Sequence, residues 1–381
     1  MDFSFTEEQL MVRDAVRKFC AGELEPIAAE IDRTGEFPMA AFRKAAELGF
    51  VGATFPEKYG GADADLVTRA LSSEEMAKVC PGFCMSLGTS SLLFGNNVYK
   101  LGTEEQRETY LPPIIRGEKI GSWCLTEPDA GSDALGIQTR AAKDGDHYVI
   151  VGRKTFITNA PVADYFIVIA RTSGEPGDIQ GGTAFIVERG MEGLTTGPKF
   201  EKMGMRCSPT GEVFFDGVRV HKSRMLGPEG MGFLGMMNSL DVERLMAAFL
   251  SVGIAQRCLE ESIRYAKERK QFRREICKFQ LIQEKIARMM LEIELARTYA
   301  FRVICLVNEG KRITRESALA KWYASEAATR VALEAIQIHG GYGYMKEYPV
   351  ERFMRDAKLL EIGAGTTEIQ KLIVAREVFF R

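Results

Sequence analysis

The 381-residue sequence has few of the features that mark membrane, nucleic-acid-binding or metal-dependent proteins. No apolar run approaches the ~20 residues that a membrane-spanning helix requires. Its 50 lysines and arginines nearly balance 52 aspartates and glutamates, so a basic surface for a nucleic acid or an acidic membrane is not expected. Only three histidines occur, far apart in the chain, which argues against a catalytic metal. We therefore expect no nucleic-acid partner, no membrane insertion and no metal site.

The cysteines also lack the spacing of a disulfide or zinc framework. There are eight, scattered along the chain, and the one close pair, Cys80 and Cys84, has no second pair or histidine nearby. Reduced thiols in a cytoplasmic protein are therefore the prediction. Near the N-terminus, Thr6 with Gln9 three positions later forms a helix-capping pattern, which predicts folded structure rather than a signal peptide.

Local patterns divide the chain into three regions and predict an α+β fold. In residues 1–121 the apolar residues recur at helical spacing, which predicts an N-terminal helical domain. Residues 122–233 contain short β-branched and aromatic runs between turns, which predict a middle domain built on a compact antiparallel sheet or barrel. Residues 234–381 return to long helical segments and favour a four-helix bundle. The expected bundle helices are about 234–268, 279–308, 313–338 and 366–379.

Two motifs in the middle region have the chemistry of a ligand site. TEPDAGSD at 126–133 offers the hydroxyls of Thr126 and Ser132 and could hold a flat polar ring or a phosphate, although an ordinary turn would contain the same residue types. FITN at 156–159 places an aromatic side chain at the end of a strand. Taken singly, Phe156 is predicted to be a core residue.

Three further motifs lie in the C-terminal region. RKQF at 269–272 presents a planar guanidinium suited to pyrophosphate, although a solvated basic helix end is the commoner arrangement. QIHGGYGY at 337–344 has paired glycines that permit a close backbone approach. EIGAGTTEIQ at 361–370 combines a bare turn with a capped helix start, so it can present peptide N–H groups to a ligand. It contributes no nucleophile or metal ligand to that turn.

Together and in this order, TEPDAGSD, FITN, RKQF, QIHGGYGY, YPVERFMRDAK and GAGTTEIQ resemble the acyl-CoA dehydrogenase family of FAD flavoproteins over essentially the whole chain. The resemblance implies FAD as the cofactor and a homo-oligomer, in most of the family a tetramer, because some residues reach FAD across a subunit interface. One departure is Arg273 with Arg274, where members commonly have glycine and a basic residue, so the shape of that loop is left open. The implied FAD contacts are Leu125, Thr126, Ser132, Phe156, Thr158, Arg269, Gln271, Phe272, Gln337, Gly341, Thr366 and Glu368.

The family removes a proton from Cα of an acyl-CoA thioester and a hydride from Cβ to flavin N5, so a carboxylate base is required. Many members place that glutamate at the position matched here by Ala364. A smaller set, isovaleryl-CoA dehydrogenase among them, carries it on the first bundle helix, and LDVER supplies Glu243 at the matching position. The Ala364 N–H would then donate to the thioester carbonyl. The implied substrate contacts are Ser132, Asp241, Arg244, Gly363 and Gly365.

The predicted activity is FAD-dependent α,β-dehydrogenation of an acyl-CoA, with electrons passed to an electron-transfer flavoprotein or similar acceptor. An enoyl-CoA reductase, a relative forming a cyclic diene and an inactive scaffold are the alternatives. Residues 82–95 carry no charge, whereas glutaryl-CoA dehydrogenases have an arginine near the position of Cys84. An uncharged short, branched or alicyclic acyl group is therefore predicted, with glutaryl-CoA a poor substrate. Gly363 either leaves room for branching or only serves the turn.

Overall fold

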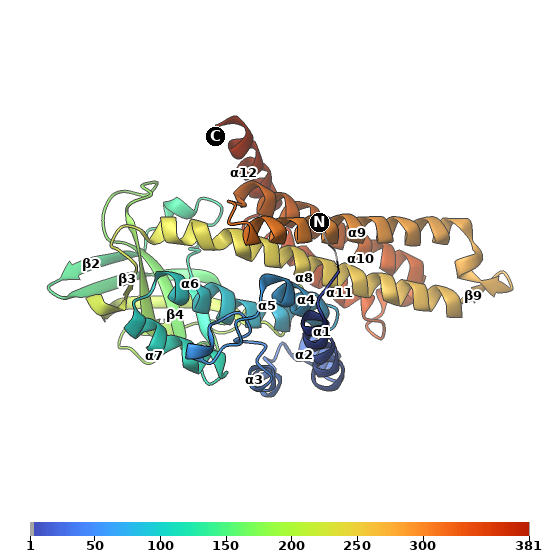
Figure 1. The fold of residues 1–381 in the computed structure, drawn as a ribbon, viewed down its shortest axis with the longest axis horizontal. Helices are drawn as coiled ribbons and strands as arrows, with labels where there is room; N and C mark the ends of the chain where they lie inside the picture. The colour runs from blue at the N-terminus through green and yellow to red at the C-terminus, as the bar shows by residue number, and fades with distance from the viewer. Residues whose placement is uncertain (1–3, 381) are drawn as a thin grey trace.

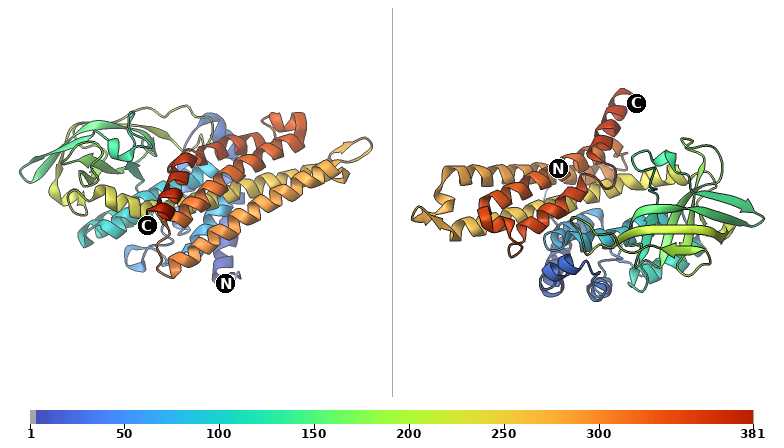
Figure 2. Two further views of the ribbon diagram at one scale, coloured as in Figure 1. Left: turned by 90° about the horizontal axis from the view of Figure 1, so that it is seen from above. Right: turned by 180° about the vertical axis from the view of Figure 1, so that it is seen from behind.

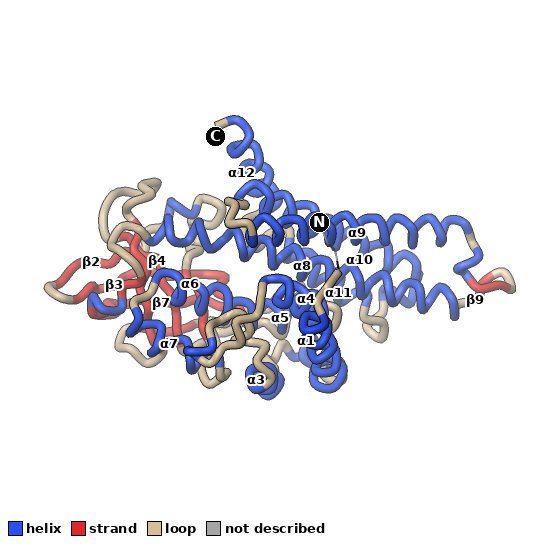
Figure 3. The backbone as a smooth tube through the Cα atoms, viewed as in Figure 1, coloured by secondary structure: helices blue, strands red, loops and turns tan. Residues whose placement is uncertain are grey.

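The computed structural model describes residues 4–380 and has the helical, β, helical order expected from the sequence. Figure 1 shows the N-terminal helices in blue and teal, the sheet in green, and long C-terminal helices from yellow to red that extend away from the sheet. The same succession is visible when helices and strands are coloured separately in Figure 3. The predicted α+β class is confirmed.

The N-terminal part consists of short helices, some of which begin at a side-chain cap. Thr6 and Gln9 form the expected capping box at the start of the first helix, and Thr103 with Gln106 forms another at α7. The helices are α1 (Glu7–Phe19), α2 (Ala28–Thr34), α3 (Met39–Glu47), α4 (Leu66–Ala77), α5 (Pro81–Gly88), α6 (Asn96–Leu101) and α7 (Glu104–Ile115). A π-helical segment, Thr89–Gly95, joins α5 to α6.

The middle part is an eight-stranded sheet with the order β6-β7-β3-β2-β4-β5-β8, and β1 pairs with β4. Most pairs are antiparallel, as expected, but both β1 and β2 run parallel to β4, so the sheet is mixed. Long β-branched and aromatic runs supply the buried faces. The strands are β1 (Gly121–Cys124), β2 (Arg140–Asp144), β3 (His147–Thr158), β4 (Tyr165–Arg171), β5 (Gly182–Glu188), β6 (Leu194–Thr196), β7 (Thr210–His221) and β8 (Met225–Leu226).

The C-terminal part contains the expected long helices and one helix that the sequence analysis missed. The unpredicted helix is α11 (Val350–Leu360), which begins within YPVERFMRDAK, ends two residues after it, and buries Val350, Phe353 and Ala357 on one face. A two-stranded hairpin follows the first long helix. The remaining elements are α8 (Gly232–Glu268), β9 (Lys270–Gln271), β10 (Arg274–Glu275), α9 (Gln280–Asn308), α10 (Thr314–His339) and α12 (Thr367–Phe379).

Helices α8, α9 and α10 lie side by side along the long axis of the molecule, whereas α12 projects from them, as Figure 1 and the right view of Figure 2 show. Helix α10 can approach α8 closely because its buried face is rich in small residues, including Ala324, Ala328 and Ala335. At 37 residues, α8 is the longest element described. It therefore reaches from the sheet to the far end of the bundle.

A buried ion pair fixes the TEPDAGSD loop against strand β3. The Lys154 side chain is 0% exposed, and its Nζ donates to Glu127 Oε1 at 2.7 Å and to the Leu125 carbonyl at 2.9 Å. The Glu127 carboxylate also accepts from the backbone N–H groups of Gln138 and Thr139. Because these contacts join the loop to β3 and to the residues just before β2, the pair determines where Thr126 and its neighbours lie.

Replacing Lys154 with methionine should lower the free energy of unfolding by about 3–5 kcal/mol, because Glu127 would remain buried without its cation. Urea denaturation of the purified protein measures this change. Lys143→Met is the matched control, since Lys143 is exposed on β2 and should change stability by less than about 0.5 kcal/mol. Equal unfolding midpoints for Lys154→Met and the unchanged protein would show that the pair is dispensable.

Candidate active site

A cavity of about 620 Å³ opens where the three parts of the chain meet. Helices α4 and α5 contribute one wall, the TEPDAGSD loop and β3 a second, and α8 with the GAG turn a third. Most of the lining near α4, α5 and α8 is apolar, including Leu87, Met246 and Leu250. The cavity thus combines residues far apart in sequence.

Glu243 is the carboxyl group in this cavity that has no cation bonded to it. It lies on α8, its Oε2 atom is buried, and that atom has no hydrogen-bond partner. Burial raises the pKa of Glu243 to about 7, although the charges of Arg244 and Lys321 act in the opposite direction. A carboxyl with this pKa can both accept and release a proton near neutral pH.

The GAG turn lies across the same cavity and is held by two buried side chains that the sequence analysis did not select. Lys321 on α10 is 1% exposed and donates to the Gly365 carbonyl at 2.8 Å. Gln370 is fully buried and its Nε2 donates to the carbonyls of Ala364 and Gly365. Small residues one turn to either side of Lys321, such as Ala318 and Ala324, were the available sequence signal.

These contacts leave one backbone donor of the turn unused. Ala364 adopts φ 55°, a left-handed conformation that is uncommon for a residue with a side chain. No described residue accepts a hydrogen bond from its N–H, and Ala364 lines the cavity. Gly363 has no positive φ, and a Cβ added there would meet only ordinary contacts, at 3.5 Å or more. The turn geometry therefore does not require glycine at position 363.

The residues expected beside a flavin ring are gathered on the other side of the cavity. Thr126, Ser132, Phe156 and Thr158 all line it, whereas Leu125 packs against the core and bonds Lys154 through its carbonyl. The single-residue expectation for Phe156 was wrong. Its side chain is 69% exposed and its φ is 56°, so the backbone holds an aromatic face outward instead of burying it.

The cavity also contains a charged side chain that the sequence analysis did not select. Residues 82–95 carry no charge, but Arg69 on the neighbouring helix α4 lines the same cavity and is only 3% exposed. Sequence analysis missed it because α4 also buries Glu74 and Glu75, so charge on this helix does not mark its solvent face.

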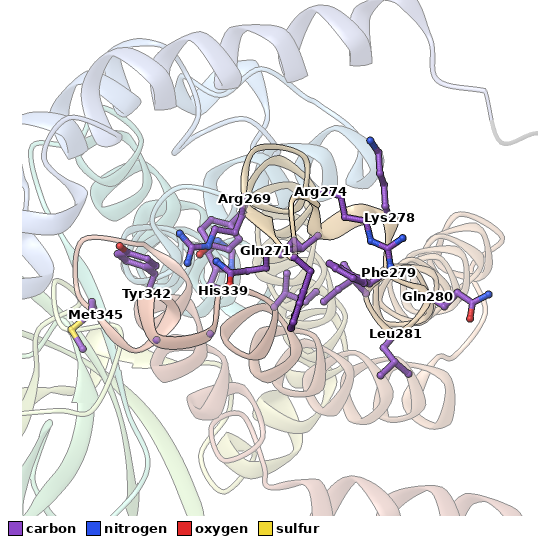
Figure 4. A pocket seen from close by; sticks show the side chains of 17 residues that line it. Arg269, Gln271, Arg274, Lys278, Phe279, Gln280, Leu281, His339, Tyr342 and Met345 are labelled. Atoms are coloured by element: carbon purple, nitrogen blue, oxygen red, sulfur yellow. The ribbon is translucent and has the colours of Figure 1, made fainter.

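A second cavity of about 1,140 Å³ lies at the far end of the bundle, around the β9–β10 hairpin. Figure 4 shows Arg269, Gln271 and His339 close together on its wall, with Tyr342 beside them. Arg269 lies over the Tyr342 ring at 5.5 Å, and no described carboxylate forms an ion pair with it. Phe272 and Gly341 also line this cavity, whereas Gln337 is exposed on the last turns of α10.

The hairpin keeps a tight two-residue turn despite the departure noted in the sequence. Gln271 pairs with Arg274, and the two central residues, Phe272 and Arg273, have φ values of 52° and 65°. Positive φ at both positions is the mark of a type I′ turn, which glycine favours at the second of them. The turn therefore presents the Phe272 side chain, 88% exposed, to solvent.

The two groups of expected flavin contacts lie too far apart to serve one cofactor within one chain. Glu243 and Arg269 lie on and at the end of the same continuous helix, and at 1.5 Å per residue they are about 39 Å apart. An extended FAD molecule is shorter than this separation. If one FAD uses both groups, the second group must come from another copy of the chain.

Four other expected residues have less direct positions. Asp241 and Arg244 are buried beside the cavity and form an ion pair at 2.9 Å, but neither lines it. Thr366 lines the cavity and caps α12 by accepting from the Ile369 N–H. Glu368 lies in the exposed first turn of that helix.

The fold and this cavity define a flavin-dependent enzyme that acts on the C–C bond of an acyl thioester. Three family models match: Acyl-CoA dehydrogenase, N-terminal domain, at residues 6–118, middle domain at 122–218, and C-terminal domain at 230–379. The chain belongs to the acyl-CoA dehydrogenase family, whose members are FAD flavoproteins that oxidise or reduce CH–CH bonds.

Known relatives match along nearly the whole chain. "Probable acyl-CoA dehydrogenase YngJ" of Bacillus subtilis is 47% identical over 99% of this chain and 100% of its own. The "Caffeyl-CoA reductase-Etf complex subunit CarC" of Acetobacterium woodii is 41% identical over 97% and 98%. The butyryl-CoA dehydrogenase structure from Megasphaera elsdenii superposes with a TM-score of 0.96 at 42% identity, covering 99% of this chain and 100% of that one.

The residues present fit FAD. Phe156 and Phe272 expose aromatic faces in the two cavities, and Arg269 offers a guanidinium that no described carboxylate neutralises. No helix in the described part of the chain is long and apolar enough to cross a membrane. No cluster of metal-ligating side chains is found among the described residues either.

Replacing Glu243 with glutamine should stabilise the protein, and more so at high pH. The pKa of Glu243 is about 7 in the folded protein and 4.5 ordinarily. Ionisation of Glu243 therefore opposes folding increasingly as the pH rises from 4.5 to about 7, and by a constant amount above pH 7. The difference in melting temperature between Glu243→Gln and the unchanged protein should therefore be larger at pH 8 than at pH 5. Thermal denaturation without added acyl-CoA measures it.

Glu361→Gln is the control, because its pH dependence should have the opposite sign. Burial alone would raise the pKa of Glu361, but hydrogen bonds, chiefly from Lys358, outweigh it and lower the pKa. Its charge therefore favours folding, and its loss should destabilise the protein at pH 8. A pH-independent difference for Glu243→Gln would mean that its carboxyl is not raised in pKa.

Proposed function

We propose that the chain catalyses α,β-dehydrogenation of an acyl-CoA thioester, with Glu243 as the base. The observation that carries this proposal is the buried, unbonded Oε2 of Glu243 in the cavity that the GAG turn also lines. Oε2 receives the Cα proton, and a pKa near 7 suits a general base at neutral pH. The usual position for the base is occupied by Ala364, which has no ionisable group.

The turn supplies the donor that this proton abstraction requires. As the Cα proton leaves, negative charge develops on the thioester oxygen, and the free Ala364 N–H donates to it. Lys321 and Gln370 hold the neighbouring carbonyls, so the N–H keeps its direction during the reaction. The substrate contacts proposed around this point are Ser132, Gly363 and Gly365, which line the cavity. Asp241 and Arg244, also expected from the sequence, are proposed to act from behind the cavity wall, where they form an ion pair.

FAD, when bound, supplies the acceptor for the hydride that leaves Cβ. Leu125, Thr126, Ser132, Phe156 and Thr158 would hold its ring end in the first cavity. Arg269, Gln271, Phe272, Gln337 and Gly341 of another copy would hold the rest, with Thr366 and Glu368 near the adenosine half. The support for this division is the separation of the two cavities along α8.

A homo-oligomer follows from that division, since a shared site needs at least two copies of the chain, and the proposed state is the tetramer found in most of the family. It is supported by apolar side chains exposed on α9, where Leu281 is 79% and Leu291 59% exposed, and at the C-terminus, where Phe379 is 76% exposed. Such exposed apolar surface marks contacts between proteins.

All eight cysteines are free thiols, which supports a cytoplasmic location.

An electron-transfer flavoprotein is the proposed electron acceptor, because a relative of this chain is a subunit of a caffeyl-CoA reductase–Etf complex. The same relative favours enoyl-CoA reduction as the second candidate function.

In the reduction of an enoyl-CoA, protonated Glu243 would return the proton to Cα. A scaffold without activity would have no use for the free carboxyl and the free N–H in one cavity. Diene formation has no separate support.

The absence of a side chain at Gly363 has a proposed role in acyl selection. Since the turn accepts a Cβ at this position, glycine leaves room beside the reacting carbons. That room suits a short branched or alicyclic acyl group. The charge at the opposite end of the acyl group is a separate question, because Arg69 lines the cavity.

Glu243→Gln should retain FAD and the fold but lower kcat by at least about 10²-fold, since a neutral isostere keeps the packing and removes the base. Flavin bleaching by acyl-CoA under anaerobic conditions measures the chemical step. In the unchanged enzyme, kcat/KM should fall as the pH drops below about 7, where Glu243 becomes protonated.

Glu361→Gln is the matched control for this experiment. Glu361 is the carboxyl nearest in sequence to Ala364, but it is bonded to Lys358 at 2.7 Å and does not line the cavity. Its variant should turn over near normally. Normal turnover in Glu243→Gln, with loss in Glu361→Gln, would transfer the role of base to Glu361.

Arg269→Ala should weaken FAD retention and loosen the oligomer together, because a pyrophosphate shared between subunits loses a charged partner. Flavin content after dialysis and gel filtration measure the two effects. Arg33→Ala is the control, since Arg33 is exposed on α2, away from the apolar surface of α9, and pairs with Glu30. A monomer that holds FAD stoichiometrically would refute a shared site.

A further inference from the structure

Arg69 lies in the proposed acyl cavity with its hydrogen-bonding capacity only partly used. Its Nη2 donates to Ser91 Oγ at 2.6 Å, whereas its Nη1 is buried and has no hydrogen-bond partner. The whole side chain is 3% exposed, so bulk water does not solvate the charge. Leaving a buried guanidinium nitrogen unbonded is costly, and native proteins rarely do so without a functional reason.

No carboxylate compensates this charge among the described residues. Of the two acidic residues lining the cavity, Glu127 is paired with Lys154, and Glu243 interacts with Arg244 and Lys321 rather than with Arg69. The only ionisable group found to interact with Arg69 is the Cys84 thiol, and burial raises the pKa of Cys84 to about 12. Cys84 is therefore protonated and neutral.

The other cation lining the cavity is in a different situation. Lys202 donates to the Ser208 carbonyl and to Thr210 Oγ1, so its ammonium group is occupied within the chain. The ion pair of Lys154 with Glu127 was described above. Arg244 beside the cavity also has a buried Nε without a hydrogen-bond partner, but it is paired with Asp241 and does not line the cavity. Among the described cations that line the cavity, Arg69 is the one with an unused buried donor.

The cavity provides a path from the reacting carbons to Arg69. Glu243, Met246 and Leu250 follow one another along one face of α8, and this face leads away from the proposed base. Helix α4 packs against α8 and contributes Arg69 and Met76 at the corresponding helical spacing. An acyl chain bound between these two helices would have its thioester end near Glu243 and its distal end toward α4.

We propose that Arg69 binds a carboxylate at the distal end of the acyl group, so that the substrate class is the CoA thioester of a dicarboxylic acid. This inference rests on the proposed function, because it needs the acyl group to occupy this cavity. A carboxylate would accept from Nη1 and neutralise the guanidinium in one contact. A methyl end would leave both the charge and the donor uncompensated.

A charged acceptor fits better than a neutral one for the same reason. A distal amide or hydroxyl could accept from Nη1, but it would leave a full positive charge buried without a counter-ion. The arginine of this chain thus comes from α4, beside Cys84, instead of from the uncharged segment 82–95. This proposal is the opposite of the prediction from sequence that glutaryl-CoA is a poor substrate, and the binding measurements below decide between them.

Binding measured without turnover tests the inference directly. The FAD-loaded Glu243→Gln variant would be titrated by calorimetry with succinyl-, glutaryl-, adipoyl- and pimeloyl-CoA, and with the ω-amide and methyl-ended acyl-CoA of each length. The best ω-carboxylate should bind about 10- to 100-fold more tightly than its two analogues, as expected for a charge-assisted hydrogen bond. Equal affinity for the carboxylate and the amide at every length would overturn the proposal.

Substitutions of Arg69 in the same background assign the effect to this side chain. Arg69→Met should remove the preference for the carboxylate, and Arg69→Lys should keep part of it, because the charge remains without the fork. Arg33→Met is the matched control, since it removes an exposed positive charge on α2 and should leave the preference unchanged. A carboxylate preference that persists in Arg69→Met would overturn the assignment. If Arg69→Met fails to fold, the comparison of carboxylate, amide and methyl ends in the Glu243→Gln variant with Arg69 intact still tests the proposal.

Turnover of the unmodified enzyme separates this inference from the proposed function. Flavin bleaching by the same acyl-CoAs reports dehydrogenation, and binding to Glu243→Gln reports recognition. Carboxylate-selective binding without any bleaching would refute the dehydrogenase and leave the Arg69 contact in place. Bleaching by methyl-ended acyl-CoAs, with no carboxylate-selective binding, would confirm the dehydrogenase and refute the contact.

Discussion

The continuous helix α8 constrains the whole site. Helix α8 has 37 residues; Glu243 lies in its first third and Arg269 directly follows its last residue. A straight helix of this length keeps those two positions far apart. The first cavity, where the three parts of the chain meet, is therefore well separated along α8 from the cavity around the β9–β10 hairpin. A cofactor that uses both must be shared between copies of the chain. Helix α10 reinforces this arrangement, because its small residues let it pack against α8 over much of their common length.

Three buried cations around the first cavity, Lys154, Lys321 and Arg69, have different kinds of partner. The kind of partner indicates whether the cation holds the fold together or is available to a ligand. Lys154 is compensated by Glu127 and positions a loop. Lys321 bonds the Gly365 carbonyl and positions the GAG turn, and burial lowers its pKa to about 8. Arg69 bonds only a serine hydroxyl and keeps a buried donor unused. An unpaired buried charge raises the free energy of the protein, so Arg69 is the cation of these three that a negatively charged ligand would stabilise most.

Much of the architecture could be predicted from the sequence. The 3.6-residue stripes gave helices within a residue or two of those observed for 279–308 and 313–338, because long periodic segments have little competing structure. Helix α11 was missed although its buried face repeats at helical spacing. Phe156 was assigned to the core from its residue type alone, whereas a positive φ turns it outward. Backbone conformations of this kind depend on neighbouring strands and are not visible in a residue's identity.

By itself the sequence determined the order of helical and β regions, which is a local property set by periodicity, capping and residue type. The resemblance of its motifs to a known family then supplied the candidate flavin contacts and the choice of Glu243 over Ala364 as the candidate base. Only the tertiary structure decided that Lys321 and Gln370 fix the GAG turn and that Arg69 reaches the cavity from α4. Those contacts join residues separated by long stretches of chain. Their effect depends on burial, because an unpaired charge is costly only where water is excluded. Burial results from the packing of the whole fold, so it cannot be predicted from the identity of one residue.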